Sequence, residues 1–418
     1  MKTYPKLINS GVEWIREIPE HWDLRKVKNS DLIKIASGRF LENYEDGQFP
    51  VYGSNGIIGK ADLYNVENVI AIGRVGTAGS VIRIPEKAWV TDNGLIVKTS
   101  SKINNDFLFY AFTNLDFSRF AQKTAQPLLT QTLLSQFQFC VPPIKEQEKI
   151  SKFLEKNLKD IDIKISNRQK LIHLLKEKRG SLIHQVLTKG LNLSVPMNDS
   201  GIERIGKIPE SWFLQKIKHN SYVKGRIGWQ GLRSDEFTDD GPYLVTGTDF
   251  KNGKINWETC HHVEQWRYDQ DSHIQLKEND VLITKDGTIG KVALVEQLPA
   301  PTTLNTGVMV IRPLHEKYLP EFLFWILQSQ QFTEFIDIIK SGSTINHLYQ
   351  ESFNNFQFTL PKTLEEQQEI INYLNNEISK IEIVISKTKS QIKKLQEYSQ
   401  SLIFSAVTGK IDVREAIV

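Results

Sequence analysis

The sequence predicts an α+β protein in which two mixed α/β domains are separated by two long helices that pair as an antiparallel coiled coil. Three observations predict this fold. A heptad pattern in the middle of the chain returns near its end, a short motif precedes each globular stretch, and mixed strand and helix patterns fill the stretches between. Because the whole plan occurs twice, we expect an internal pseudo-two-fold repeat.

The first long helix is expected over residues 143–190. Its a/d seam reads Leu154, Leu158, Ile161, Ile165, Arg168, Ile172, Leu175, Arg179, Leu182 and Val186. Gly180 is the one glycine before the expected cap at Gly190. At ~1.5 Å per residue, about 40 residues make a rod of roughly 60 Å. An apolar stripe this narrow on a rod this long needs another long helix as its partner.

The partner is a second copy of the pattern, expected within residues 362–418. Its seam reads Leu374, Ile378, Ile381, Ile385, Thr388, Ile392, Leu395, Ser399, Leu402 and Ala406. The two polar positions of the first seam, Arg168 and Arg179, are polar here as well, and we interpret the arginines as devices that set register or dock a partner. The lysines of the first helix fit a solvated face better than a ligand-binding one.

Each globular stretch follows a repeated motif, Ile-Pro-Glu-x-Trp, at residues 18–22 and 208–212. We therefore divide the chain into five parts. The first globular domain spans 1–142, the first long helix 143–190 and a linker 191–207. The second globular domain spans 208–361, and the second long helix with its tail spans 362–418. The central parts of the two halves differ in length. The repeated motifs and long helices are therefore alike in the two halves, while the globular parts between them differ.

Strands and one helix are expected in each globular domain. In the first, strands at 69–72 and 80–84 flank the glycine-rich turn 73–79, and a strand at 95–97 and a helix at 106–120 follow. In the second, strands at 281–284 and 292–295 flank the turn 285–290, and a strand at 307–311 and a helix at 320–339 follow.

Composition places the chain among ordinary soluble proteins. Hydrophobic residues make up 40% and charged residues 24%, and the formal net charge is +3, which permits a polyanionic partner without demanding one. The two cysteines, Cys140 and Cys260, favour a reducing compartment. No run approaches ~18 apolar residues, so we expect a cytoplasmic protein with no membrane partner.

Loops rich in glycine carry basic, amide and hydroxyl side chains of the kind that contact phosphates and base edges. The candidates for DNA binding are Tyr52, Ser54, Asn55, Lys60, Arg74, Thr77, Arg226, Trp229, Gln230, Arg233, Lys285, Thr288 and Lys291. Ordinary glycine turns and surface loops, with Trp229 in the core, are the alternative interpretation of the same residues.

Catalytic and metal sites are not indicated. A nucleotide-binding P-loop is disfavoured because Ala61 and Val292, rather than Ser or Thr, follow the lysines of the glycine-rich loops. Cys260, His261, His262 and His273 lack the second ligand pair that a zinc site requires. No methyltransferase Asn/Asp-Pro-Pro-Tyr/Phe motif is present. We expect neither catalytic residues nor metal ligands on this chain.

Two unlike globular heads on a rigid spacer would fix a distance along a long regular polymer. Double-stranded DNA presents equivalent groove faces every ~34–36 Å, so it is the natural ligand of such a ruler. Heads of different sequence would read two different half-sites separated by a fixed gap.

Several repeated motifs carry a resemblance to a known family. They are Ile-Pro-Glu-x-Trp at 18–22 and 208–212, Gly-Thr-x-Gly at 76–79 and 287–290, Gly342–Leu348, and the Pro to Glu-Gln-x-x-Ile runs at Pro142–Ile150 and Pro361–Ile370. Together they cover nearly the whole chain, which resembles the specificity subunit of type I restriction–modification systems. One departure is Gln126-Pro127-Leu128-Leu129, which stands where the second half has Ser343-Thr344-Ile345-Asn346.

The resemblance implies a non-catalytic reader of double-stranded DNA. Each globular domain would be a target-recognition domain, and the long helices would set the gap and dock two methyltransferase subunits, with restriction/translocase subunits in the same complex. The resemblance implies no cofactor on this chain, because S-adenosylmethionine, ATP and Mg would be bound by the partner subunits. The alternative is a two-headed coiled-coil scaffold that binds proteins instead of DNA.

Overall fold

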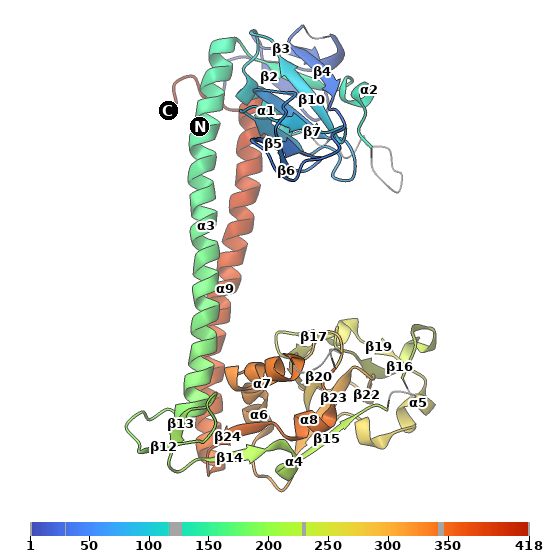
Figure 1. Cartoon of the computed structure of the whole chain (residues 1–418), viewed down its shortest axis with the longest axis vertical. Helices are drawn as coiled ribbons and strands as arrows, with labels where there is room; N and C mark the ends of the chain where they lie inside the picture. The colour runs from blue at the N-terminus through green and yellow to red at the C-terminus, as the bar shows by residue number, and fades with distance from the viewer. Residues whose placement is uncertain are drawn as a thin grey trace. The chain divides into compact units, whose positions relative to one another are not determined.

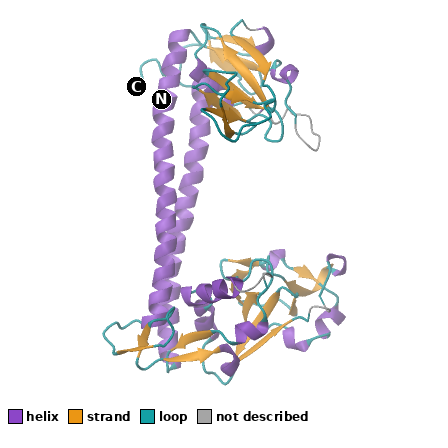
Figure 2. Ribbon diagram, in the orientation of Figure 1, coloured by secondary structure: helices purple, strands orange, loops and turns teal. Residues whose placement is uncertain are grey.

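The computed structural model describes residues 2–29, 31–115, 117, 128–227, 231–341 and 347–416 (Figure 1). The chain divides into two compact units. One consists of Met1–Gln169 with Thr388–Val418, and the other of Lys170–Lys387. Two long helices, α3 (Ile144–Lys189) and α9 (Leu364–Val407), contribute to both units, while the strands lie outside them (Figure 2).

Both long helices begin and end where the sequence predicts. Helix α3 starts directly after Pro142-Pro143, and Gly190 follows it with a φ of 72°. Gly409 follows α9 with a φ of 74°, and a Cβ at this position would lie 2.3 Å from Cδ of Pro19. Glycine is therefore required at 409 both for the left-handed backbone and for the close approach of the chain.

The two long helices pair in antiparallel fashion through the predicted seam. In the first unit Leu154 and Ile161 share an apolar core with Leu402 and Ala406. In the second unit the other ends meet, since Ile183 and Val186 share a core with Leu374 and Ile378. Every seam position is buried or partly buried, which confirms the heptad prediction.

The two seam arginines have partners on α9. Arg168 donates to Oε1 of Gln391 at 3.0 Å, and Arg179 pairs with Glu382 at 3.1 Å. Arg179 also donates to Oε1 of Gln328 at 3.0 Å, which ties α3 to the second globular domain. These contacts fit the interpretation that the arginines set register.

The globular part of the first unit contains a four-stranded antiparallel sheet and a three-stranded sheet. The first sheet has the order β4 (Ile33–Ser37), β10 (Gly94–Thr99), β7 (Val69–Gly73), β8 (Val81–Ile84). The second has the order β6 (Ile57–Ala61), β5 (Phe49–Tyr52), β9 (Trp89–Val90), with β5 and β9 parallel. We call residues 23–141 globule 1.

Globule 2, residues 213–360, repeats this plan in the second unit. Its larger sheet has the order β15 (Ser221–Gly225), β23 (Val308–Pro313), β20 (Val281–Thr284), β21 (Val292–Leu294), β18 (Lys254–Ile255), β17 (Phe250–Lys251). Its smaller sheet has the order β19 (His261–His262), β16 (Thr238–Val245), β22 (Thr302–Leu304), with β16 and β22 again parallel. The added strands β17 and β18 contribute to the greater length of the second half.

The globule helices are short, and several of them were not expected from the sequence. Those of globule 1 are α1 (Asn105–Thr113) and α2 (Gln131–Leu134). Those of globule 2 are α4 (Ile217–Asn220), α5 (Gln265–Asp269), α6 (Pro320–Ile326), α7 (Gln330–Ser341) and α8 (Gln350–Asn354).

Two helix predictions need correction. The helix expected over 320–339 is two helices, because the backbone N–H groups of Gln328 and Ser329 donate to carbonyls three residues back, at 3.1 and 3.0 Å, and this tight turn separates α6 from α7. The helix expected over 106–120 ends at Thr113. Phe117 then turns into the core, where its ring lies edge-on to that of Phe112.

Small two-stranded ribbons, which the sequence did not predict, join each globule to the long helices. They are β1 (Leu7–Asn9) with β2 (Glu17–Pro19), β3 (Asp23–Lys26) with β11 (Gln138–Val141), β12 (Met197–Asp199) with β13 (Lys207–Pro209), and β14 (Phe213–Lys216) with β24 (Gln357–Leu360). The same ribbons occur in both halves.

The repeated Trp and Glu motifs meet at the start of each long helix. Nε1 of Trp22 donates to Oε2 of Glu146 at 2.9 Å, and Nε1 of Trp212 donates to Oε1 of Glu366 at 2.8 Å. The glutamines that follow serve the globules, because Oε1 of Gln147 accepts from the backbone at Asn104 and Oε1 of Gln367 accepts from Leu319. The motifs are therefore joints of the fold.

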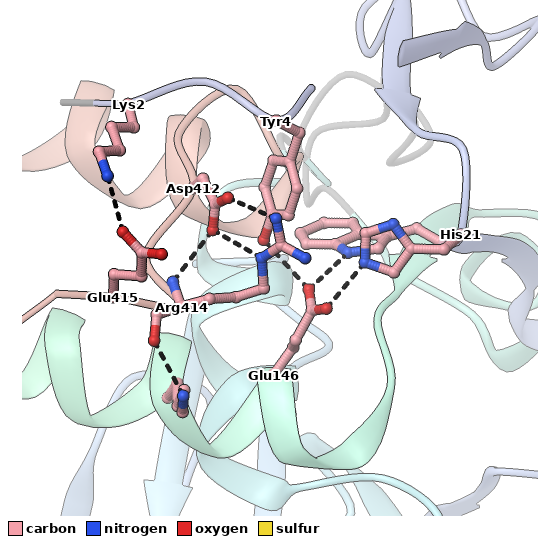
Figure 3. Close-up of polar contacts among 9 residues, drawn as sticks. Lys2, Tyr4, His21, Glu146, Asp412, Arg414 and Glu415 are labelled. Carbon is pink, nitrogen blue, oxygen red and sulfur yellow. Dashed lines mark hydrogen bonds and ion pairs between the residues drawn. The ribbon is translucent and has the colours of Figure 1, made fainter. Parts of the chain in front are cut away.

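Glu146 accepts several hydrogen bonds at once (Figure 3). Besides Trp22, the hydroxyl of Tyr4 donates to Oε2 at 3.1 Å, and Nε2 of His21 lies 2.7 Å from Oε1. Next to this group Arg414 pairs with Asp412 and its guanidinium lies over the ring of Tyr4. The carboxylate thus joins α3 to the segments on either side of the first ribbon, and Tyr4 links this joint to the segment after α9.

No helix in the described ranges combines the length and the apolar character needed to cross a membrane.

We expect Glu146→Ala to lower the free energy of unfolding by about 1–3 kcal/mol, because Trp22 and Tyr4 would lose their acceptor in a largely buried place. Glu148→Ala, at an exposed position on the same helix turn, is the matched control and should change it by less than about 0.5 kcal/mol. Urea unfolding followed by tryptophan fluorescence measures both. Equal effects of the two substitutions would contradict the role given to Glu146.

Candidate nucleic-acid interface

The glycine-rich turns of the two globules adopt the same backbone conformation. Gly76 and Gly79 have φ values of 72° and 96°, and their counterparts Gly287 and Gly290 have 66° and 85°. Each turn is closed by a hydrogen bond from its last glycine to the end of the preceding strand, at 2.8 Å in globule 1 and 3.0 Å in globule 2. Since such φ values favour glycine, the repeated glycines preserve the shape of the turn.

Each turn begins with a cation at the same place. Arg74 follows β7 directly, and Lys285 follows β20. The backbone N–H of Arg74 donates to Asn93 and its carbonyl accepts from Leu129, both at 2.9 Å. Lys285 makes the same pair of bonds with Gly307 and Leu348, at 2.8 and 2.9 Å. The backbone at both cations is held from two sides, so the fold fixes the point from which each side chain extends.

Four predicted contact residues of globule 1 come together around its turn. The hydroxyl of Ser54 donates to the same Asn93 carbonyl that holds Arg74, at 3.0 Å. The side chain of Asn55 accepts from the hydroxyl of Ser80 at 3.0 Å, and the N–H of Ser80 donates to Thr77. Ser54, Asn55, Arg74 and Thr77 therefore form one polar surface.

Sequence reasoning missed Ser80 and Asn93, which complete this surface. Asn93 lies in Asp92-Asn93-Gly94, a turn signature directly before a strand, and this was the signal that could have found it. Ser80 closes the glycine turn itself. Its contact with Asn55 depends on how β5 and β7 approach each other, which the sequence alone does not show.

In globule 2 the turn brings together Lys285, Thr288 and Lys291. The buried hydroxyl of Thr284 donates to the Thr288 carbonyl at 2.6 Å and accepts from the N–H of Lys291 at 2.9 Å. The side chains of Thr288 and Lys291 are exposed. Burial lowers the pKa of the half-buried Lys285, while the neighbouring Asp286 raises it.

Arg226 lies in the interior of globule 2, so a direct groove contact, which the sequence suggested, does not fit its position. Only 1% of this residue is exposed. Its Nε donates to the Leu304 carbonyl at 2.7 Å and its Nη2 to the hydroxyl of Thr303 at 3.1 Å. Burial lowers its pKa. The buried guanidinium of Arg226 therefore stabilises β22 by donating to two of its residues.

The other predicted contact residues lie apart from the two turns or outside the described residues. Tyr52 is buried in a core cluster, and burial raises the pKa of its hydroxyl. Lys60 is exposed on β6, and Arg233 is exposed beside the short turn Ser234–Glu236. Trp229 and Gln230 lie outside the described residues, as do Gly342–Asn346, Gln126 and Pro127 of the sequence motifs.

Three side chains of the cysteine and histidine motif in globule 2 make contacts with nearby backbone and aromatic groups. Sγ of Cys260 contacts the Asn256 carbonyl, the ring of His261 stacks on Phe237, and Nδ1 of His262 lies 2.8 Å from the Gly241 carbonyl. Among the residues whose placement the structure gives, no group of three or more His, Cys, Asp or Glu side chains could hold a metal ion.

Comparison with known proteins decides the family. The model of the type I restriction modification DNA specificity domain matches residues 19–174 and 230–394, which is more than half of the chain. The chain belongs to this family. It is a specificity subunit, the non-catalytic component of a type I restriction–modification system, and the two matched segments are its two repeats.

Curated relatives agree with this assignment. The MjaVIII specificity subunit of Methanocaldococcus jannaschii is 25% identical over 95% of this chain and 94% of its own length. The EcoprrI specificity subunit of Escherichia coli is 31% identical over 29% of this chain and 31% of its own length. The specificity subunit described here thus aligns with the first of these relatives from end to end.

Solved structures show the same fold. One, described as the structural basis of complex assembly and conformational transition of the type I R-M system, matches with a TM-score of 0.71 at 13% identity, over 94% of this chain and 99% of that one. The HsdS subunit from Thermoanaerobacter tengcongensis matches with a TM-score of 0.51 at 14% identity, over 94% and 98%. The predicted fold of mixed domains and paired long helices is confirmed.

Both thiols of the specificity subunit should react slowly while it is folded. Cys140 and Cys260 are buried, and burial raises the pKa of each thiol to about 12. Because the thiolate is the reactive form, only about one thiol in 10⁴ is ionised at pH 8, and the reaction rate should rise with pH up to that pKa.

Ellman's reagent measures this difference at pH 8, with glutathione as the exposed control. We expect slow release in the native protein and rapid titration of 2 thiols after unfolding in guanidinium chloride. Rapid titration of the native protein would contradict the burial of these side chains.

Proposed function

We propose that this specificity subunit recognises an asymmetric bipartite DNA site, with one half-site read by each globule. The observation that carries the proposal is the pair of equivalent glycine turns, which present Arg74 with Thr77 in globule 1 and Lys285 with Thr288 in globule 2. The same backbone frame presents different side chains around these turns. Two globules with the same fold and different side chains suit two different half-sites on one DNA molecule.

The turn residues divide into two chemical roles. Lysine and exposed hydroxyl groups such as Lys291 and Thr288 suit phosphate oxygens, which fix the position of a protein on the duplex. Arginine and amide side chains such as Arg74 and Asn55 suit base edges, since arginine favours guanine and asparagine favours adenine in the major groove. The fixed backbone of each turn reduces the ordering cost of such contacts.

The gap between the half-sites is assigned to the paired helices α3 and α9. Their seam is continuous in heptads, and the contacts of Arg168 with Gln391 and of Arg179 with Glu382 hold one register. A helix pair locked in register is a spacer of defined length. This spacer is proposed to set the number of base pairs between the two half-sites.

The partners are proposed from the repeat and from the family. Two methyltransferase subunits would dock on equivalent surfaces of the two halves, and restriction/translocase subunits would join the same complex. Adenine methylation or DNA cleavage would take place on those partners, which would bind S-adenosylmethionine, ATP and Mg. The specificity subunit would recognise the DNA site and hold the catalytic subunits on it.

Sequencing of methylated DNA tests the proposed function. Cells that express this chain with its methyltransferase should acquire a methyladenine motif of two unlike half-sites with a fixed gap, absent from cells with the methyltransferase alone. If an active methyltransferase gains no such motif from this chain, the two-headed protein scaffold becomes the better explanation.

Lengthening the helix pair tests the spacer. A heptad inserted into both α3 and α9 beside the Arg168–Gln391 contact adds ~10 Å, the rise of about three base pairs, while the seam stays in register. We expect the methylated motif to keep both half-sites and to gain a longer gap. New bases at the original gap would show that the helices do not set the distance.

A further inference from the structure

The residue after each turn cation differs in kind between the two globules. Val75 follows Arg74, and Asp286 follows Lys285. Across from them, Val75 forms an isolated β-bridge with Leu128, whereas Nδ1 of His347 lies 2.5 Å from Oδ1 of Asp286. An aliphatic pair in globule 1 thus stands where globule 2 has an acid and a histidine.

The two pairs occupy the same place in the fold. In both globules the backbone carbonyl of the turn cation accepts a hydrogen bond from the residue after the second member of the pair, Leu129 in one and Leu348 in the other. Leu128-Leu129 thus corresponds to His347-Leu348, which corrects the expected correspondence with Ile345-Asn346 by two residues. The pairs therefore lie beside Arg74 and Lys285, on the surface proposed to meet DNA. The two pairs therefore give this surface different groups with which to contact a base.

The acid of globule 2 is held and still accessible. The side chain of Asp286 is 45% exposed and that of His347 is 25% exposed. The ring of Tyr349 lies 4.5 Å from that of His347, measured between centroids, and supports it from another side. His347 engages one carboxylate oxygen, so the exposed carboxylate keeps acceptor capacity toward an incoming group.

A carboxylate in this position is unfavourable for phosphate and favourable for one kind of base edge. Asp286 would repel a phosphate, although Lys285 and Lys291 nearby offset its charge. An acceptor-only group suits an exocyclic amino group, such as N4 of cytosine or N6 of adenine. The aliphatic pair of globule 1 offers no acceptor, and it suits the methyl group of thymine.

We propose that this residue pair selects a base in each half-site: Asp286, oriented by His347, accepts from the amino group of a base in the half-site of globule 2, and Val75 with Leu128 contacts a thymine methyl in the half-site of globule 1. The proposal rests on the proposed function. His347 is a positioning residue, because it acts through Asp286.

The decisive experiment gives globule 2 the side chains of globule 1. The full-length double variant Asp286→Val/His347→Leu is expressed with the methyltransferase, and its methylation motif is sequenced beside that of the wild type. We expect the preference for an amino-bearing base at one position of one half-site to fall about tenfold or more, with the other half-site and the gap unchanged. Lys254→Val/Glu296→Leu, which removes an exposed ion pair of the same globule, is the matched control and should leave the motif intact.

Two further variants separate selection from folding. Asp286→Asn preserves shape and adds a donor, so it should shift the preference at that position toward a base that carries an acceptor. His347→Asn, whose amide can donate to Asp286, should retain the wild-type preference where His347→Leu relaxes it. Thermal unfolding reports which variants are folded. If the double variant does not fold, the two asparagine variants decide.

The proposal is overturned if folded variants methylate the original motif with unchanged base preference. It is also overturned if a folded double variant methylates neither that motif nor any single-base change of it, since the pair would then position the globule and select no base. Failure of the proposed function is distinct, because the wild type itself would then produce no bipartite motif.

Discussion

The apolar seam between α3 and α9 is the constraint on which the rest of the structure depends. Each helix carries a stripe too narrow for a small core, so each needs the other. The ends of the pair then become the places where the globules attach. Glu146 and Glu366 contribute to this attachment by accepting hydrogen bonds from Trp22 and Trp212. The motifs that are easiest to recognise in each repeat therefore lie at these joints.

The two globules show how one frame can hold different chemistry. The order of the shared strands agrees between them, including the parallel pairing of β5 with β9 and of β16 with β22. Glycines with positive φ keep the turns alike. What differs is the set of side chains that the turns present, such as Val75 against Asp286. Under the proposed function, this arrangement lets the frame stay constant while the residues proposed to read DNA change.

The sequence predicted the parts that local periodicity controls. The heptads placed α3, α9 and their seam, and alternating apolar residues around glycines placed β7, β8, β20 and β21. Local sequence patterns do not predict contacts between segments that are distant in the chain. The Trp22 and Glu146 motifs were both noticed, yet nothing local says that they touch. Arg226 was mistaken for a surface cation because its acceptors, the ends of β22, come from almost 80 residues further along the chain.

One chimera tests most directly the claim that each globule reads its own half-site. Residues 27–137 are replaced by a copy of residues 217–356, which joins the chain at equivalent points of the ribbons β3–β11 and β14–β24. Because α3 and α9 run antiparallel, we expect a palindromic methylated motif, with the half-site of globule 2 at both ends and the original gap. A chimera that folds and still methylates the original asymmetric motif would contradict it.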